Sequence, residues 1–133
     1  HYCSRRQRQM CIRDSGISMI AVSESFAMAE KLGLSAQNLF DITSSSSSQC
    51  WAMTSYLPVP GPVPASPANN DYQPGFSGAM MAKDMKLAQD AAISSGQKTE
   101  LADSALQMYE RFLAEGGSSK DFSAIYNMIN NSS

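Results

Sequence analysis

The chain has 133 residues, enough for one domain with a hydrophobic core but too few for a nucleotide-binding domain and a substrate domain together. A net charge of -2 and a pI near 5.2 argue against nucleic acid as the main partner, because phosphate binding needs a concentrated basic surface. Three cysteines and one histidine favour neither a disulfide framework nor a metal site, and the longest apolar runs are too short to cross a membrane.

The first fifteen residues differ in composition from the rest of the chain. Arginine, glutamine, cysteine and serine dominate them, and no apolar period is visible. We therefore expect residues 1–15 to be a foreign or disordered tail, and residues 16–133 to form the domain. The tail is basic but has no apolar signal core, so we expect a cytoplasmic protein, or a mitochondrial one in a eukaryote. His1 lies in the tail and is given no function.

Apolar residues at helical spacing predict a first helix from about residue 17 to Gly33. Its expected inward positions are Ile17, Ile20, Ala21, Ser25, Met28 and Leu32. Ser35 is expected to cap a second, short helix with Leu39, Phe40 and Ile42 facing inward.

Five prolines between residues 58 and 67 exclude a helix there and predict a long irregular segment. We expect it to be packed, because apolar anchors accompany it. These anchors are Trp51, Tyr56, Leu57 and Val59.

Three more helices follow in the predicted order. The first spans about residues 77–94, the second runs from a cap at Thr99 to Gly116, and the third starts at Ser119 or Asp121. Leu101 is among the residues expected to line the second. No segment alternates with a period of two, so the predicted fold class is all-α.

Several short motifs occur in a specific order along these elements. They are Ser46-Ser47-Ser48-Gln49-Cys50-Trp51, Pro58-Val59-Pro60-Gly61, Ser66-Pro67-Ala68-Asn69-Asn70, Tyr72-Gln73-Pro74-Gly75-Phe76, Ala82-Lys83-Asp84-Met85-Lys86-Leu87-Ala88-Gln89 and Asp121-Phe122-Ser123-Ala124. In this order and spacing the chain resembles the C-terminal domain of the 3-hydroxyisobutyrate dehydrogenases, within the β-hydroxyacid dehydrogenase family. The resemblance extends from about Gly16 to Asn130.

This resemblance implies a truncated enzyme: a helical C-terminal domain of the 6-phosphogluconate dehydrogenase-like type, without its Rossmann domain. The complete enzyme would use NAD to oxidise a small 3-hydroxy acid to its semialdehyde, as in valine catabolism, and would form a homo-oligomer, a dimer, through the helical half. No Gly-x-Gly-x-x-Gly occurs in the chain, so the fragment alone should be inactive. The alternatives are a relative of the tartronate semialdehyde reductases and a non-catalytic helical dimerisation module.

The resemblance also assigns site residues. The family has a lysine for proton transfer and, one turn later, an asparagine that holds the substrate, and counting back places Arg8 and Ile12 at these positions. A guanidinium stays protonated, so we assign this chain no catalytic residue. Lys83 matches the lysine that reaches the cofactor, with a solvated surface lysine as the alternative. Phe76 would lie near the nicotinamide, or else in the core.

Two further side chains of the motifs receive less specific expectations. The role of Asp84, next to the cofactor lysine, is left open, because adjacent helical residues point apart. Cys50 is expected to be a small buried residue rather than a nucleophile, since no basic residue near it in sequence would lower its pKa.

Overall fold

The computed structural model describes residues 4–132, and this part of the chain is helical, without a strand. Its elements are α1 (Arg5–Lys31), α2 (Ala36–Thr43), α3 (Trp51–Thr54), η1 (Pro67–Asn70), α4 (Gly78–Ser95), α5 (Glu100–Phe112), η2 (Leu113–Gly117), η3 (Phe122–Ala124) and α6 (Ile125–Asn131). One isolated bridge joins Ser77 to Asp121. The all-α prediction is confirmed. No helix within residues 4–132 is long and apolar enough to cross a membrane.

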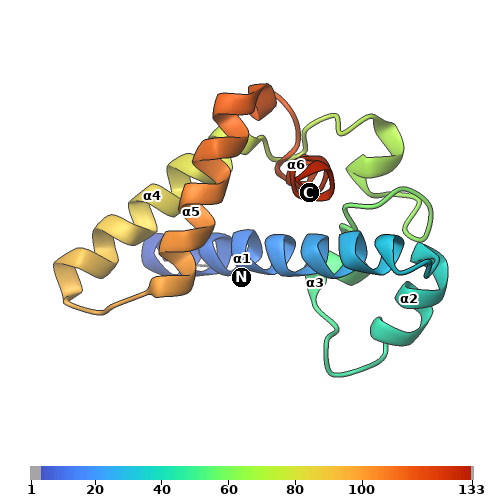
Figure 1. Ribbon diagram of the computed structural model, residues 1–133. Helices are drawn as coiled ribbons and strands as arrows, with labels where there is room; N and C mark the ends of the chain where they lie inside the picture. The colour runs from blue at the N-terminus through green and yellow to red at the C-terminus, as the bar shows by residue number, and fades with distance from the viewer. Residues whose placement is uncertain (1–3, 133) are drawn as a thin grey trace.

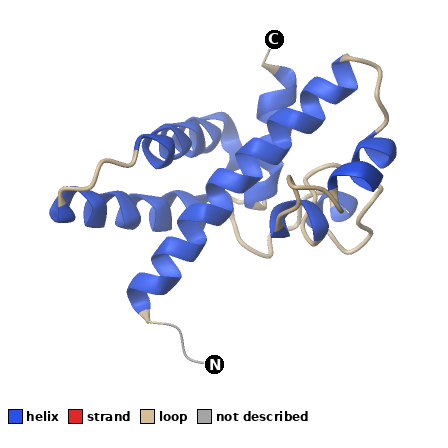
Figure 2. Cartoon of the chain, turned by 90° about the horizontal axis from the view of Figure 1, so that it is seen from below, coloured by secondary structure: helices blue, strands red, loops and turns tan. Residues whose placement is uncertain are grey.

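The long helix α1 is the axis on which the other elements pack. It contacts α2, α3, α4, α5 and α6. Figure 1 shows α4 and α5 as an antiparallel pair over the N-terminal half of α1, with α2 and α3 near its C-terminal half. Seen from below in Figure 2, this pair lies on one side of α1 and the loops of the proline-rich region lie on the other.

The start of α1 corrects the expectation for the first fifteen residues. The helix begins at Arg5, where Ser4 and Gln7 form a reciprocal capping box. The structure therefore contradicts a disordered tail over residues 5–15, whereas a foreign origin of this segment stays a prediction. No glycine or proline interrupts this segment, and Ile12 packs against the core. Residues 1–3, including His1, lie outside the described residues.

The buried face of α1 also differs from the predicted one. Met28 and Leu32, expected to face inward, are 63% and 71% exposed. The side chains that α1 buries completely or nearly so include Met19, Ser23 and Phe26. Because this 27-residue helix is covered by different neighbours along its length, a single apolar stripe does not describe its buried face.

The boundaries of α2 and α4 lie close to the predicted ones. Ser35 and Ser77 cap α2 and α4 through their hydroxyls, and Gly96 ends α4 in the left-handed region (φ 78°). Gly116, also with positive φ (97°), ends the last turn after α5. Asp121 caps η3, which leads directly into α6.

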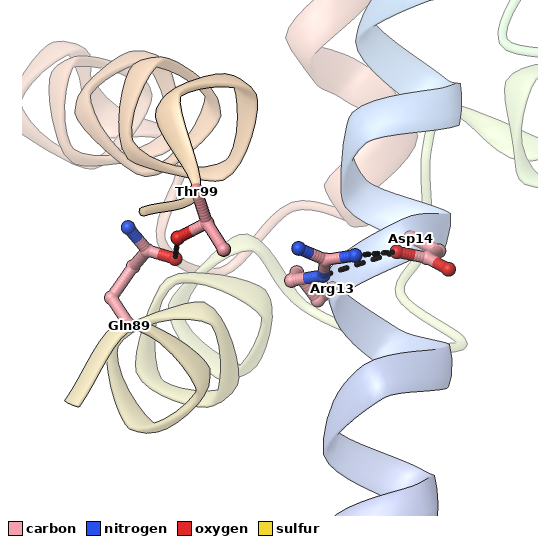
Figure 3. Close-up of polar contacts among 4 residues, drawn as sticks. All are labelled: Arg13, Asp14, Gln89 and Thr99. Carbon is pink, nitrogen blue, oxygen red and sulfur yellow. Dashed lines mark hydrogen bonds and ion pairs between the residues drawn. The ribbon is translucent and has the colours of Figure 1, made fainter. Parts of the chain in front are cut away.

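Thr99 starts α5 as predicted, but its side chain makes no cap bond. Its hydroxyl instead donates to Gln89 Oε1 of α4 over 2.9 Å, which ties the two helices together. Figure 3 shows this bond opposite the pair formed by Arg13 and Asp14 on α1, whose closest distance is 2.7 Å.

Two inward assignments on these helices are wrong. Ile42 of α2 is 69% exposed and Leu101 of α5 is 75% exposed. Leu39 and Phe40, the other two residues expected to face inward from α2, do pack against the core as partly buried side chains, and α5 buries Ala102 next to the exposed Leu101. Spacing alone located the helices but not the angle at which each one meets its neighbours.

The proline-rich segment is packed, as predicted. Leu57 is fully buried, Pro58 is buried beside it, and the Tyr72 hydroxyl donates to the Pro58 carbonyl over 2.7 Å. Trp51 differs from the expected buried anchor, since it is 53% exposed. The segment thus holds its shape through a few buried contacts while Trp51 stays at the surface.

Candidate functional site

An apolar pocket of about 370 Å³ lies between α1, α3, the start of α4, the loop before α4 and the short helix η3. Eight residues line it: Ile12, Ser15, Trp51, Tyr56, Gly75, Phe76, Met81 and Phe122. They come from four segments that are distant in sequence. A pocket with this lining suits a small molecule with a planar or apolar part.

Four aromatic rings form one continuous wall of this pocket. Trp51 stacks on Tyr56 with 4.8 Å between ring centroids, and Tyr56 stacks on Phe122 at 5.4 Å. Phe76 meets Phe122 edge to face at 6.0 Å. Offset and edge-to-face contacts at these distances are favourable, so the four rings support one another's orientation.

Backbone pairing holds the loop before α4 against the loop before α6. The amide of Asp121 donates to the Tyr72 carbonyl over 2.9 Å, and the amide of Phe122 donates to the Phe76 carbonyl over 2.8 Å. One step further along, Gly78 donates to the Lys120 carbonyl over 2.8 Å. These bonds fix Phe76 and Phe122 side by side in the wall.

Asp121 is fully buried behind this wall and accepts bonds through both carboxylate oxygens. Oδ1 accepts from the Tyr56 hydroxyl at 2.7 Å and from the amides of Gly75 and Phe76 at 3.0 and 3.1 Å. Oδ2 accepts from the amide and the hydroxyl of Ser123. Burial, and then the hydrogen bond and the charge of Asp121, raise the pKa of Tyr56 well above its usual value. The phenol therefore keeps its proton at neutral pH.

The sequence indicated only part of this arrangement. Asp121 was predicted as a possible helix start, and its bond to the Ser123 amide is the local signature of such a cap. Tyr56 was expected only as an apolar anchor. The bonds from Asp121 to Tyr56 and Gly75 cross 65 and 46 residues, and no local signal in the sequence points to them.

The structure brings some of the expected site residues together and leaves others apart. Phe76 lines the pocket, and so does Ile12. Arg8, one turn earlier on α1, is exposed. Lys83 is exposed on α4 and is not among the residues that line the pocket.

The remaining candidates on α3 and α4 have ordinary surroundings. Asp84 and Cys50 are both half-buried, and neither lines the pocket. Lys86 pairs with Asp90 at 3.0 Å, whereas Lys83 forms no ion pair within residues 4–132. The same residues contain no cluster of three or more histidine, cysteine, aspartate or glutamate side chains that would hold a metal ion.

Comparison with known proteins bears directly on these residues. A family model described as "NAD-binding of NADP-dependent 3-hydroxyisobutyrate dehydrogenase" matches residues 15–129. The chain belongs to this family. Every residue of the aromatic wall lies within the matched range, and so do Asp121 and Lys83.

Relatives of the 3-hydroxyisobutyrate dehydrogenase family are longer than this chain. It is 48% identical over 113 residues to a Mycobacterium tuberculosis protein named "Probable 3-hydroxyisobutyrate dehydrogenase", covering 85% of this chain and 38% of that protein. The 3-hydroxyisobutyrate dehydrogenase of Drosophila melanogaster, named as mitochondrial, is 42% identical over 113 residues, which are 85% of this chain and 35% of that protein. The chain thus spans little more than a third of the curated relatives it matches.

Solved structures agree on the fold. The M. tuberculosis 3-hydroxyisobutyrate dehydrogenase solved with L-serine matches with a TM-score of 0.88 and 44% identity, over 92% of this chain and 42% of that one. A Salmonella typhimurium 3-hydroxyisobutyrate dehydrogenase matches in fold at 20% identity, with a TM-score of 0.77 over 91% and 40% of the two chains. The predicted helical C-terminal domain of this enzyme type is confirmed.

Proposed function

We propose that this domain forms the substrate side of an NAD-dependent dehydrogenase that oxidises 3-hydroxyisobutyrate to its semialdehyde, in valine catabolism. One observation carries the proposal. Residue 12, the position that the resemblance gives to the substrate-binding asparagine, and Phe76, which it places near the nicotinamide, line the same pocket. Two positions inferred independently from the resemblance thus meet at one place in the fold.

The residues present fit a nicotinamide cofactor. The four-ring wall offers flat apolar surface to a planar ring, and Lys83 is an exposed cation with no ion-pair partner in the described chain, available to a phosphate oxygen. Bound NAD would supply the hydride acceptor. The part of this chain is to orient the substrate and to exclude water from one side of it, which the apolar lining favours.

The substrate class has support from two sides. L-serine, present in the M. tuberculosis structure, is itself a 3-hydroxy acid, and the relatives carry the name of 3-hydroxyisobutyrate. A small apolar pocket also suits the methyl-bearing carbon of 3-hydroxyisobutyrate, because apolar contact needs no polar partner there. We therefore favour 3-hydroxyisobutyrate over the more polar tartronate semialdehyde.

Proton transfer is the step that this chain does not provide. Arg8 stands at the position of the family's lysine, and a guanidinium does not exchange a proton near neutral pH. Tyr56 does not replace it, because its hydroxyl is committed to Asp121 and its pKa is raised, by burial first and then by that carboxylate. The chain alone is therefore expected to be inactive.

The decisive experiment joins this chain to the Rossmann domain of the M. tuberculosis relative. Three proteins are compared: the plain fusion, the fusion with Arg8→Lys, and the fusion with Arg8→Lys and Ile12→Asn. Oxidation of 3-hydroxyisobutyrate with NAD should appear with the lysine and rise further with the asparagine. A folded doubly restored fusion that oxidises neither 3-hydroxyisobutyrate nor L-serine would refute the proposal.

The cofactor role of Lys83 has its own test in the doubly restored fusion. Lys83→Ala should weaken NAD binding by roughly ten-fold or more, since a charge-assisted hydrogen bond contributes about 1.5–3 kcal/mol. Lys86→Ala is the matched control, one turn further along α4 and already paired with Asp90. Equal affinity for NAD with and without Lys83 would remove this residue from the site.

The homo-oligomer is proposed on the exposed apolar side chains. Leu32, Ile42, Ile93 and Leu101 are each more than two thirds exposed, and contact with a second copy would remove part of this apolar surface from water. Self-association of the fusion should appear in sedimentation at micromolar concentration. A monodisperse monomer would contradict this part of the proposal.

A further inference from the structure

Asp121 is a buried ionisable group that the proposed chemistry does not use. It is fully buried, it forms no ion pair with any cation among residues 4–132, and it does not line the pocket. A buried carboxylate without a cation is unfavourable unless hydrogen bonds compensate it. Here five donors converge on its two oxygens.

The two oxygens of Asp121 have different tasks. Oδ2 accepts only from Ser123, within the first turn that Asp121 caps. Oδ1 accepts from Tyr56, Gly75 and Phe76, none of which belongs to that turn. A helix cap needs only one of these oxygens. The other is engaged entirely with residues that line the pocket.

The space around Gly75 is so tight that a side chain at this position would force neighbouring atoms to move. A Cβ at this position would lie 2.7 Å from the Tyr56 hydroxyl oxygen, well inside contact distance. The hydroxyl is thus enclosed between the Gly75 backbone and the Asp121 carboxylate. Its position in turn sets the Tyr56 ring, which stacks between Trp51 and Phe122.

We propose that Asp121 is the positioning residue of the pocket: through Oδ1 it fixes both the Tyr56 ring and the Gly75–Phe76 backbone, and so orients two walls of the pocket at once. The consequence of this geometry rests on the proposed function, since it matters for turnover only if substrate or nicotinamide occupies the pocket. The geometry itself is testable without any activity.

Trp51 provides the spectroscopic signature. It is the only tryptophan of the chain, and it stacks directly on Tyr56, so its fluorescence reports the position of that ring. Three variants of the 133-residue chain are compared with the parent: Asp121→Asn, which removes the charge; Gly75→Ala, which displaces the Tyr56 hydroxyl and leaves Asp121 intact; and Ser123→Ala, which removes a donor to Oδ2 only.

The positioning role predicts one pattern in these variants. Asp121→Asn and Gly75→Ala should both shift the Trp51 emission and make it more accessible to a neutral quencher, whereas Ser123→Ala should leave both unchanged. Tyrosinate absorbance, taken as the difference from the matching Tyr56→Phe protein, should move to lower pH in Asp121→Asn. Circular dichroism shows whether each variant is folded. If Asp121→Asn does not fold, Gly75→Ala still tests the positioning role.

Two results would overturn the inference. One is an unchanged Trp51 signal in folded Gly75→Ala and Asp121→Asn. The other is an equal change in Ser123→Ala, which would reduce Asp121 to a helix cap.

The restored fusion separates this inference from the proposed function. Gly75→Ala should lower kcat by up to about a hundred-fold, the effect of a displacement near 1 Å. Adding Tyr56→Phe should recover part of the loss, because removing the hydroxyl makes room for the new methyl group. A folded but inactive doubly restored fusion refutes the proposed function while the Trp51 results stand. An active doubly restored fusion that is insensitive to Gly75→Ala refutes the positioning role.

Discussion

Two buried tyrosines offer a direct test of the packing described above, because they differ mainly in the partner of the hydroxyl. Tyr109 is fully buried, and its hydroxyl has no hydrogen-bond partner among residues 4–132. Tyr72 is 8% exposed, and its hydroxyl donates to the Pro58 carbonyl over 2.7 Å. Replacing each by phenylalanine removes the same single oxygen from the core, and we expect effects of opposite sign.

The expected magnitudes follow from the cost of burying an unpaired hydroxyl. This cost is about 1–3 kcal/mol, and Tyr109→Phe removes it. The variant also loses the packing contacts of the oxygen, so the net stabilisation of the fold should be about 1 kcal/mol. Tyr72→Phe loses a hydrogen bond and leaves the Pro58 carbonyl unpaired, which should destabilise the fold by about 1–2 kcal/mol. The two variants should therefore differ by roughly 2–3 kcal/mol.

Urea unfolding at neutral pH measures both free energies of unfolding on the same chain. The slope against urea should be unchanged, so that the shift in midpoint reports stability alone. If Tyr109→Phe destabilises the protein as much as Tyr72→Phe does, the reasoning is refuted. The Tyr109 hydroxyl would then have a partner in solution, such as an ordered water, and the core would be more polar there than its side chains indicate.

Three further outcomes are expected from the same unfolding assay. Gly78→Ala should cost about 1–3 kcal/mol, because its Cβ would lie 2.6 Å from Phe112 Cε2 and 2.8 Å from the Gly117 carbonyl oxygen; a neutral result would show that this contact relaxes freely. Ser77→Ala, which removes the N-cap bond of α4, should cost about 1 kcal/mol, whereas Ser77→Gly should cost only a few tenths; equal costs would contradict a capping role. Burial raises the pKa of Tyr72 from 10.0 to about 12, and Asn127 opposes this shift. The stabilisation of the fold by protonated Tyr72 is therefore complete below pH 10 and is lost as the pH rises to 12. This loss is at most about 3 kcal/mol, and Tyr72→Phe should make the alkaline decline shallower; an identical decline would contradict the shift.

Helix ends were more predictable than helix faces, and the reason is the range of the interactions involved. Ser35, Ser77 and Gly96 act on backbone groups a few residues away, so their effect is encoded locally. The buried face depends on which neighbours a helix meets. Met28 and Leu32 satisfy the helical period and are nevertheless exposed, because packing on α1 favours other faces of that helix.

The start of α1 was missed for a related reason. Residues 5–15 carry little apolar periodicity, but the Ser4–Gln7 capping box is a local helix signal that the sequence contains. Continuing the helix back to Arg5 places Ile12 against the core and in the pocket lining. A weakly amphipathic segment is thus helical here because it extends a helix that is already held by tertiary contacts.

The candidate site likewise combines residues that the sequence indicates with contacts that only the fold creates. Phe76 was placed in it by resemblance, whereas the link from Asp121 to Tyr56 joins residues 65 positions apart, and nothing short of the fold brings them together. Lys83 was also placed by resemblance, and it lies outside the pocket lining on the exposed side of α4.

Positioning and chemistry are separable in this chain. The aromatic wall and the carboxylate behind it come from residues 51–122, all within the range that the family model matches, and their contacts with one another do not depend on Arg8. Under the proposed function, proton transfer would depend on position 8, one helical turn before Ile12, which lines the pocket. Ligand binding at the wall should therefore persist with arginine at position 8, while turnover should require lysine. A restored lysine that improved binding and turnover equally would show that the two are not separable.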